Sequence, residues 1–423
     1  MFVRMFGSAV IIQALLSATN FFVGLILIRR TSDLQYGYYV LVNNAILFTS
    51  GFINAFIQPP LVLLTSQADR DTRANLIGGL YREQRVLLRW AGPALLAIVA
   101  MLWLARVIPP DLAQLATGAV TLVLVTLYKE TFRMVLFVFR RSYDVLWADV
   151  CYVIIVVSLV PWATLTRAPA ATVVFVLAAA GAASALVASR LLWRYEPWDT
   201  HSTTRVLRRL APVGGWSAAG STTHWAFSQG YNYVVAAVLD VPAVAALAAT
   251  RLLMMPVNLL SSGIISLMMP TAAAWLTAHG PATVLRRLCL TASALAAFAL
   301  CYFAILWIWR EPIFTHVIHK SFLHRDQLLL VWFAVFLVMV FRDQLQYLPG
   351  VNALYRPLTG LTAASAVVSL TVGYFAMLHA GAIGALLGVL LGELLNLSGI
   401  IFLSMLCIRA ARDGSVTATL HAR

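Results

Sequence analysis

The segment TVVFVLAAAGAASALVASRLLWRYEPWDTHSTTRVLRRL, residues 172–210, contains the two features that determine the fold. Its first part is a nearly continuous apolar run. A membrane-spanning helix needs roughly 20 such residues to cross about 30 Å of hydrocarbon. Its second part, from Arg194 to Arg209, is polar and rich in arginine. We therefore interpret the segment as a membrane span followed by a basic linker outside the membrane.

The composition of the whole chain supports this interpretation. Of its 423 residues, 61% are apolar and 11% are charged, whereas soluble domains carry about 25% charged residues. The mean hydropathy is +0.86. So little charge could not cover the surface of a soluble protein of this size, which excludes a soluble enzyme, a disordered chain and a secreted disulfide scaffold. The sequence predicts an all-α integral membrane protein with many spans.

Twelve apolar runs are long enough to be transmembrane helices. The polar segment at about 194–209 separates six runs from six, so we predict an N-terminal six-helix lobe of residues 1–198 and a C-terminal six-helix lobe of residues 199–423. The predicted spans lie near 5–28, 38–65, 86–108, 112–139, 144–166, 169–193, 208–236, 241–271, 284–308, 327–350, 358–379 and 382–407.

The loops between these spans differ in their arginine content. When they are assigned alternately to the two sides of the membrane, the loops at 66–85 and 194–207 fall on the same side, which carries most of the arginines. By the positive-inside rule this side is cytoplasmic, and both termini are then cytoplasmic as well. These loops account for the net charge of +14, so we expect no nucleic-acid partner.

The two halves resemble each other weakly. An aspartate opens the second predicted span of each half, and a proline lies near the end of each of these spans. An adjacent basic and acidic residue recurs in the fourth span of each half, as Lys129-Glu130 and Arg342-Asp343. Three matches in the same order favour an internal repeat, which makes the two lobes pseudo-symmetric. Many transporters are built from such repeats, with the binding site between them.

Four basic residues lie inside the predicted spans. Lys129 lies about 16 Å from the cytoplasmic end of its span, at about 1.5 Å per residue, where its side chain reaches water with difficulty. Arg251 lies at a similar depth, and Arg133 and Arg342 lie nearer the cytoplasm. Four cations facing lipid would together cost on the order of 10 kcal/mol. We therefore expect them to face protein or a water-filled cavity.

Two interpretations of these bases remain open. They can be neutralised in buried pairs, since Arg133 and Arg342 each have an acid within three residues. Alternatively, Lys129 and Arg251 leave an excess of two positive charges, and a hydrated cavity with that excess attracts an anion such as phosphate or carboxylate. We favour anion binding and regard all four bases as candidate substrate contacts.

Other polar residues are weaker candidates. Polar residues recur at helical spacing in the first two spans of each half, where packing through small side chains explains the serines equally well. Asn20, Asn44 and His224 are further candidate substrate contacts, although a hydrogen-bonded core position is the commoner role for a lone histidine. The candidates for coupling to protons or sodium are Glu130, Asp343 and Glu393.

The sequence also contains features that we assign to packing. The spacing of Gly384, Gly388 and Gly392 predicts close helix contact. No catalytic motif, metal-ligand spacing or phosphate-binding glycine loop is present in the sequence. We therefore expect no enzymatic activity, no metal and no cofactor.

Three stretches resemble a known family. Residues 33–39, DLQYGYY, are similar to the D-x-x-Y-G-x-Y signature that follows the first helix of polysaccharide-export flippases. The eighth predicted span, from Ala249 to Trp275, and the turn from Asn352 to Pro357 are similar to theirs as well. The chain thus resembles the Wzx-type lipid-linked oligosaccharide flippases of the multidrug/oligosaccharidyl-lipid/polysaccharide transporter superfamily.

The resemblance implies a MATE-like pair of six-helix lobes around a cationic cavity. It implies that the protein moves a polyprenyl-diphosphate-linked oligosaccharide across the bacterial inner membrane by alternating access, for the synthesis of surface polysaccharides such as lipopolysaccharide or exopolysaccharide. The partners implied are membrane lipids, the anionic lipid-linked glycan, a glycan polymerase and export machinery. Lys129, Arg133, Arg251 and Arg342 fit the cavity by charge and position.

Two other functions stay open. A cation-coupled drug antiporter of the same fold should present unpaired acids in its cavity, whereas bases are in excess among the candidates above. A membrane glycan polymerase or ligase needs a large outer loop for its catalytic groups. The largest predicted outer loop, from Trp309 to Asp326, is short for that purpose.

Overall fold

The computed structural model describes residues 2–65, 68–139, 141–195, 198–199, 202 and 204–412. Within these ranges every regular element is a helix, as the composition predicts. The chain forms two compact units, Met1–Trp225 and Ala226–Arg423. The division into lobes at the linker near 194–209 stays a prediction, since residues 206–225 fall within the first of these units.

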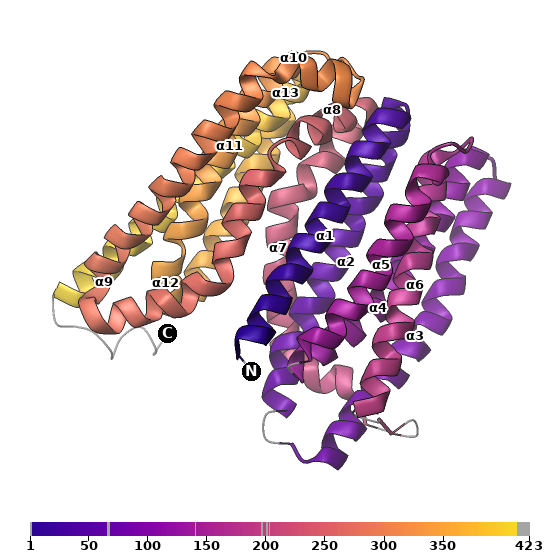
Figure 1. Cartoon of the computed structure of the whole chain (residues 1–423), viewed down its shortest axis with the longest axis horizontal. Helices are drawn as coiled ribbons and strands as arrows, with labels where there is room; N and C mark the ends of the chain where they lie inside the picture. Colours follow the sequence, from indigo (N-terminus) through magenta and orange to yellow (C-terminus); the bar gives the residue numbers. More distant parts are fainter. Residues whose placement is uncertain are drawn as a thin grey trace. The chain divides into compact units, whose positions relative to one another are not determined.

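Long helices make up the first unit, and several of them run side by side in Figure 1. α4 packs against α2, α3, α5 and α6, and α1 packs against α5. The fourth helix, which carries two of the predicted bases, therefore lies among four others. The helices are α1 (Phe2–Arg30), α2 (Asp33–Thr65), α3 (Arg70–Leu104), α4 (Pro110–Val138), α5 (Ser142–Ala163), α6 (Pro169–Tyr195) and the first part of α7 (Val206–Val238).

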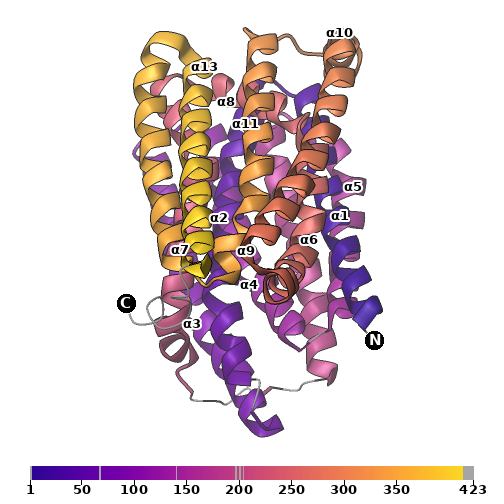
Figure 2. The same ribbon diagram turned by 90° about the vertical axis from the view of Figure 1, so that its left-hand side faces the viewer.

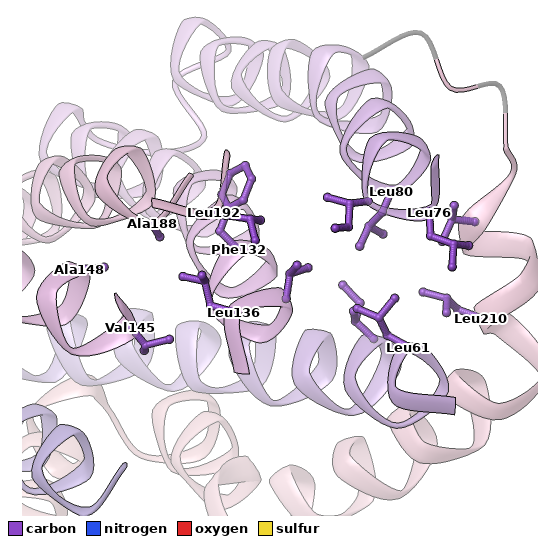
Figure 3. Close-up of a cluster of buried hydrophobic side chains, with 14 of the residues drawn as sticks. Leu61, Leu76, Leu80, Phe132, Leu136, Val145, Ala148, Ala188, Leu192 and Leu210 are labelled. Carbon is purple, nitrogen blue, oxygen red and sulfur yellow. The ribbon is translucent and has the colours of Figure 1, made fainter. Parts of the chain in front are cut away.

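A cluster of buried apolar side chains joins the helices of the first unit at one end (Figure 3). In Figure 3, Leu61 of α2 and Leu80 of α3 point toward one another, and Leu136 of α4 lies nearer Val145 and Ala148 of α5. Leu210 from the beginning of α7 is fully buried in the same cluster. Close packing of this kind supplies many small dispersion contacts, and it holds the beginning of α7 against the first unit.

The second unit contains the rest of α7 and the remaining helices. α11 packs against α9 and α13, and Figure 2 shows α11 beside α13. α12 lies between α9 and α13 and contacts both of them. The elements are α8 (Val241–Leu252), α9 (Met255–Ile308), α10 (Arg310–Pro312), a π-helical turn (Ile313–Ile318), α11 (Arg325–Leu345), α12 (Tyr347–Val351) and α13 (Tyr355–Arg412).

Two of these helices are broken at glycines. Gly280 in α9 has φ 75° and ψ 171°, and Gly381 in α13 has φ 54° and ψ −138°. Positive φ is costly for residues with a Cβ but not for glycine. The breaks divide α9 into 255–279 and 281–308, and α13 into 355–380 and 382–412, so each forms two helical segments.

The number of helical segments agrees with the twelve predicted spans. Nine helices of the described residues are long and apolar enough to cross a membrane, and there are ten if the bent pair Val241–Leu252 and Met255–Ser261 forms one span. α13 is counted once among these although Gly381 divides it, and α7 has 33 residues but is not counted among them. With the second half of α13 and with α7, the described helices correspond to the twelve predicted spans. The predicted all-α membrane fold is confirmed.

The two halves of α13 pack very closely, as the glycine spacing predicts. A Cβ atom on Gly388 would lie 2.4 Å from the Cα of Gly373, and one on Gly384 would lie 2.3 Å from backbone atoms of Ala376. Contact this close between helix backbones requires glycine on the approaching face.

Candidate functional site

The first unit contains a polar cavity of about 170 Å³. Side chains from α1, α2, α4, α5 and α6 line it. This volume holds several water molecules or a small charged group, since about 10–15 Å³ of such space is enough for one water molecule. The polar residues of the lining are Asn20, Tyr39, Asn43, Ser50, Thr126, Lys129, Glu130 and Tyr152.

Lys129 presents its ammonium group to this cavity. Its Nζ lies 4.2 Å from the centre of the Tyr152 ring and 3.9 Å from Oε1 of Glu130. The ring face stabilises the cation electrostatically. Among the described residues, none accepts a hydrogen bond from Nζ within 3.5 Å. The three N–H donors of Lys129 therefore remain available to a ligand.

Arg133, one turn further along α4, is neutralised by acids. Its Nε lies 3.2 Å from Oδ2 of Asp149, and its Nη1 lies 3.4 Å from Oε2 of Glu130. Asp149 is 1% exposed, and burying a charge is tolerable only when it is paired. Lys129, Arg133, Glu130 and Asp149 together have no formal net charge, so the expected excess of positive charge is absent from this cluster.

The positions of these side chains follow from helical spacing. Thr126, Lys129 and Arg133 lie three or four residues apart and share one face of α4. Asp149 and Tyr152 lie three residues apart on α5, which packs against α4. Neither was among our candidates. An aspartate inside an apolar span, with an aromatic residue one turn later, was the available signal.

The three neutral candidates occupy different positions. Asn20 is exposed and lines the cavity together with Lys129. Asn44 is buried and does not belong to the lining, although its neighbour Asn43 does. The backbone carbonyl oxygen of Asn44 accepts a hydrogen bond from Nε1 of Trp225 at 2.9 Å. His224 is exposed on α7 and is also not part of the lining.

In the second unit, Arg342 binds two carboxylates. Its Nη1 donates to both oxygens of Glu393 at 2.9 and 2.8 Å. Its Nε and Nη2 donate to Oδ1 of Asp343 at 3.0 and 2.7 Å. The structure thus brings together three predicted residues from α11 and α13. Since all three guanidinium nitrogens are engaged, Arg342 is suited to holding the helices together.

Arg251 has a different environment at the end of α8. Its Nη1 donates to Oε1 of Gln229 at 2.9 Å, to the hydroxyl of Tyr231 at 3.2 Å and to the carbonyl of Ser228 at 3.4 Å. The guanidinium group lies 5.2 Å from the centre of the Trp332 ring. In the described part of the chain, its Nε and Nη2 have no acceptor.

The four predicted bases therefore fall into two classes. Arg133 and Arg342 donate hydrogen bonds to acids, whereas Lys129, whose Nζ is 3.9 Å from Glu130, and Arg251 keep unused donors. A planar N–H pair such as Nε and Nη2 of Arg251 matches the two oxygens of a phosphate or carboxylate. Each unit thus supplies one paired and one open cation, and the meeting of the two open cations in one cavity stays a prediction.

Comparisons with known proteins agree with this architecture. No protein-family model matches the sequence, and no curated protein matches it either. Among solved structures, an inward-facing multidrug resistance MATE family transporter of the MOP superfamily matches with a TM-score of 0.77 at 13% identity, covering 96% of each chain. The lipid II flippase MurJ in an inward closed conformation matches with a TM-score of 0.71 at 9% identity, covering 95% of this chain and 87% of that one.

A third structure gives a similar match. A MOP superfamily transporter from Pyrococcus furiosus, whose description reports a binding pocket of reverse polarity, matches with a TM-score of 0.65 at 12% identity, covering 97% of this chain and 96% of that one. At such low identities these matches concern the fold. The chain has the MATE-like, all-α membrane fold of the MOP superfamily transporters.

Proposed function

We propose that this protein is a flippase that moves a polyprenyl-diphosphate-linked oligosaccharide from the cytoplasmic to the outer leaflet of the bacterial inner membrane. The observation that carries the proposal is the open guanidinium edge of Arg251. The fold, which a lipid II flippase also has, and the residues that resemble polysaccharide-export flippases support it. The glycan would serve the synthesis of a surface polysaccharide.

The chemistry of a diphosphate suits the two open cations. Arg251 offers a planar pair of donors for bidentate binding, and Lys129 offers a compact positive charge. The contacts of Arg251 with Gln229 and Tyr231 fix the guanidinium orientation without cancelling its charge. In this proposal Arg251 and Lys129 contact the diphosphate, while Arg133 and Arg342 maintain the helix packing around them.

The membrane potential can give the transport its direction. An inside-negative potential favours outward movement of negative charge by about 2.3 kcal/mol per charge for each 100 mV. A diphosphate headgroup therefore gains free energy when it leaves the cytoplasmic side. Alternating access of the two lobes would carry the headgroup while the polyprenyl chain stays in lipid. Glu130, Asp343 and Glu393 remain candidates for ion coupling.

Complementation of glycan export tests this proposal. In a strain without its own flippase for the same glycan, we expect the wild-type chain to restore surface polysaccharide and the double variant K129A/R251A to fail at equal protein level. The matched control R190A/R409A removes two exposed arginines and should export normally. Normal export by K129A/R251A would overturn the assignment of these two residues.

One observation favours a second function, a cation-coupled small-molecule antiporter of the same fold. One acid, Glu130, lines the small cavity of the first unit, although it is paired with Lys129 and Arg133. A drug-accumulation assay in cells without their own exporters separates the two functions. Drug efflux by the wild-type chain that is lost in E130Q, together with normal glycan export in K129A/R251A, would favour the antiporter.

A further inference from the structure

Six arginines of the first unit lie on α3 and at the beginning of α7, two segments that contact each other. Arg82 is partly exposed, and the other five are exposed. We call this group the arginine patch, and it plays no part in the proposed transport site. Its members are Arg82, Arg85 and Arg89 of α3, Arg205 just before α7, and Arg208 and Arg209 in the first turn of α7.

Direct contacts hold the two parts of the patch together. The backbone N–H of Leu207 donates to Oε2 of Glu83 at 2.8 Å. A Cβ atom on Gly79 would lie 2.6 Å from the carbonyl oxygen of Thr204 and 2.8 Å from Cγ2 of Val206. The beginning of α7 therefore rests on α3 at Gly79 and Glu83, next to the turns that carry the arginines, and the patch has a fixed framework.

Hydrogen bonds from the linker reinforce this framework. The backbone N–H of Asp199 donates to the carbonyl of Ala74 at 3.1 Å, and Oγ of Ser202 donates to the carbonyl of Asn75 at 2.8 Å. The ring centre of Trp198 lies 5.8 Å from that of Tyr81 and 4.6 Å from that of Trp193. The patch is thus supported by backbone and aromatic contacts that do not depend on its charges.

The arginines of the patch lack acidic partners. Within the described residues, none of the six forms an ion pair. Glu83 lies on α3 between Arg82 and Arg85. Its carboxylate accepts a hydrogen bond from the backbone N–H of Leu207. Six positive charges that form no ion pair among the described residues create a strong local attraction for anions.

The patch adjoins the apolar part of α3. After Arg89, no charged residue follows until the helix ends at Leu104. Val86 is 50% exposed, Leu87 56% and Trp90 74%. Exposed apolar and tryptophan side chains at such a boundary are typical of the interface between membrane and water. The arginines are therefore at the level where lipid phosphates lie.

We infer that the arginine patch binds the headgroups of anionic phospholipids in the cytoplasmic leaflet. Clusters of four to eight basic residues directly beside a membrane helix attract anionic lipids, at about a fivefold gain in association for each basic residue near the surface. The exposed apolar residues of α3 contact the acyl chains of the same lipids, and the guanidinium groups contact their phosphates. Because the patch joins α3 to the start of α7, bound lipid stabilises that junction.

Spin-labelled lipids test this inference on the full-length protein. The wild-type chain is reconstituted in phosphatidylcholine vesicles with trace spin-labelled phosphatidylglycerol or phosphatidylcholine, and the protein-bound fraction of each label is measured by electron paramagnetic resonance. We expect the wild-type chain to prefer phosphatidylglycerol about fivefold or more at low salt. The preference should shrink at high salt, where screening shortens the range of the charges.

Matched variants show which arginines cause the preference for phosphatidylglycerol. The patch variant R85Q/R89Q/R208Q should lose most of it, and R85K/R89K/R208K should keep it. The control R190Q/R286Q/R409Q removes the same charge from exposed arginines elsewhere and should keep it too. Equal unfolding midpoints in phosphatidylcholine show that the variants are folded. A full preference in the patch variant, an equal loss in the control, or no preference in the wild-type chain would overturn the inference.

Discussion

Replacing Arg342 by methionine should destabilise the second unit strongly, and more than replacing Glu393 by glutamine does. Arg342 binds Glu393 and Asp343 at nitrogen–oxygen distances from 2.7 to 3.0 Å. Glu393 is 3% exposed, so removal of the guanidinium leaves a buried carboxylate without the cation that donates hydrogen bonds to it. In E393Q, by contrast, Arg342 keeps its two bonds to Asp343.

The magnitude follows from the burial of this cluster. Removing one partner of a buried ion pair costs about 3–5 kcal/mol. Protonation of the stranded carboxyl group limits the loss, so we expect about 3 kcal/mol for R342M. For E393Q, in which a charged acceptor becomes an amide, we expect about 1–2 kcal/mol. The double variant R342M/E393Q should be more stable than R342M, because the uncharged glutamine needs no cation.

Reversible unfolding in mixed micelles of a mild detergent and sodium dodecyl sulfate measures these free energies, with circular dichroism as the readout. The four proteins form a double-mutant cycle that isolates the coupling between the two residues. A free energy of unfolding for R342M within about 1 kcal/mol of the wild-type value would refute the reasoning. So would a greater loss in E393Q than in R342M.

Three further predictions concern packing, the cavity and the linker. In the same unfolding assay, Gly388→Ala should lower the free energy of unfolding by about 1–3 kcal/mol, because its Cβ would lie 2.4 Å from a facing Cα. Gly360→Ala, whose Cβ would have no atom within 4 Å, should raise it by up to about 1 kcal/mol. Equal effects of the two substitutions would contradict the close helix contact. In the export assay, Tyr152→Leu should reduce glycan export because it removes the ring beneath Lys129, and Tyr152→Phe should not; equal export by both would contradict that role. Gly78→Ala would place a Cβ 1.8 Å from the carbonyl oxygen of Asp199 in the linker. The clash should displace the linker from α3, so limited proteolysis should cut the linker faster than in the wild-type chain. An unchanged rate of cleavage would show that this contact is unimportant.

The features that the sequence predicts well are local along one helix. Apolar runs, the arginine-rich linker and the spacing of Gly384, Gly388 and Gly392 are read from neighbouring residues, and the structure contains the helices, the linker and the close contact that they predict. The adjacent basic and acidic pairs in the fourth span of each half were also visible, because i, i+1 and i, i+3 neighbours can be read directly. The run at 208–236, which lies in α7 and is less apolar than the helices counted above, was also predicted as a span.

The features that the sequence misses arise between helices. Asp149 neutralises Arg133 from a different helix, 16 residues away, so an inventory of acids near each base overstated the positive charge. Glu393 reaches Arg342 from 51 residues away. Which donors of Arg251 remain unused depends on Gln229 and Tyr231 of α7. Such partners are fixed by tertiary packing. A single sequence shows which residues are candidate partners but not which of them pair.

The most direct test of the proposed function is translocation by the purified protein. Vesicles containing the protein and a polyprenyl-diphosphate-linked oligosaccharide are made with an inside-negative potential, and the glycan in the outer leaflet is measured by its accessibility to added periodate. We predict that wild-type protein makes the initially protected glycan accessible faster than protein-free vesicles do, and that K129A/R251A does not. Glycan that stays protected with wild-type protein as in protein-free vesicles would contradict the proposal.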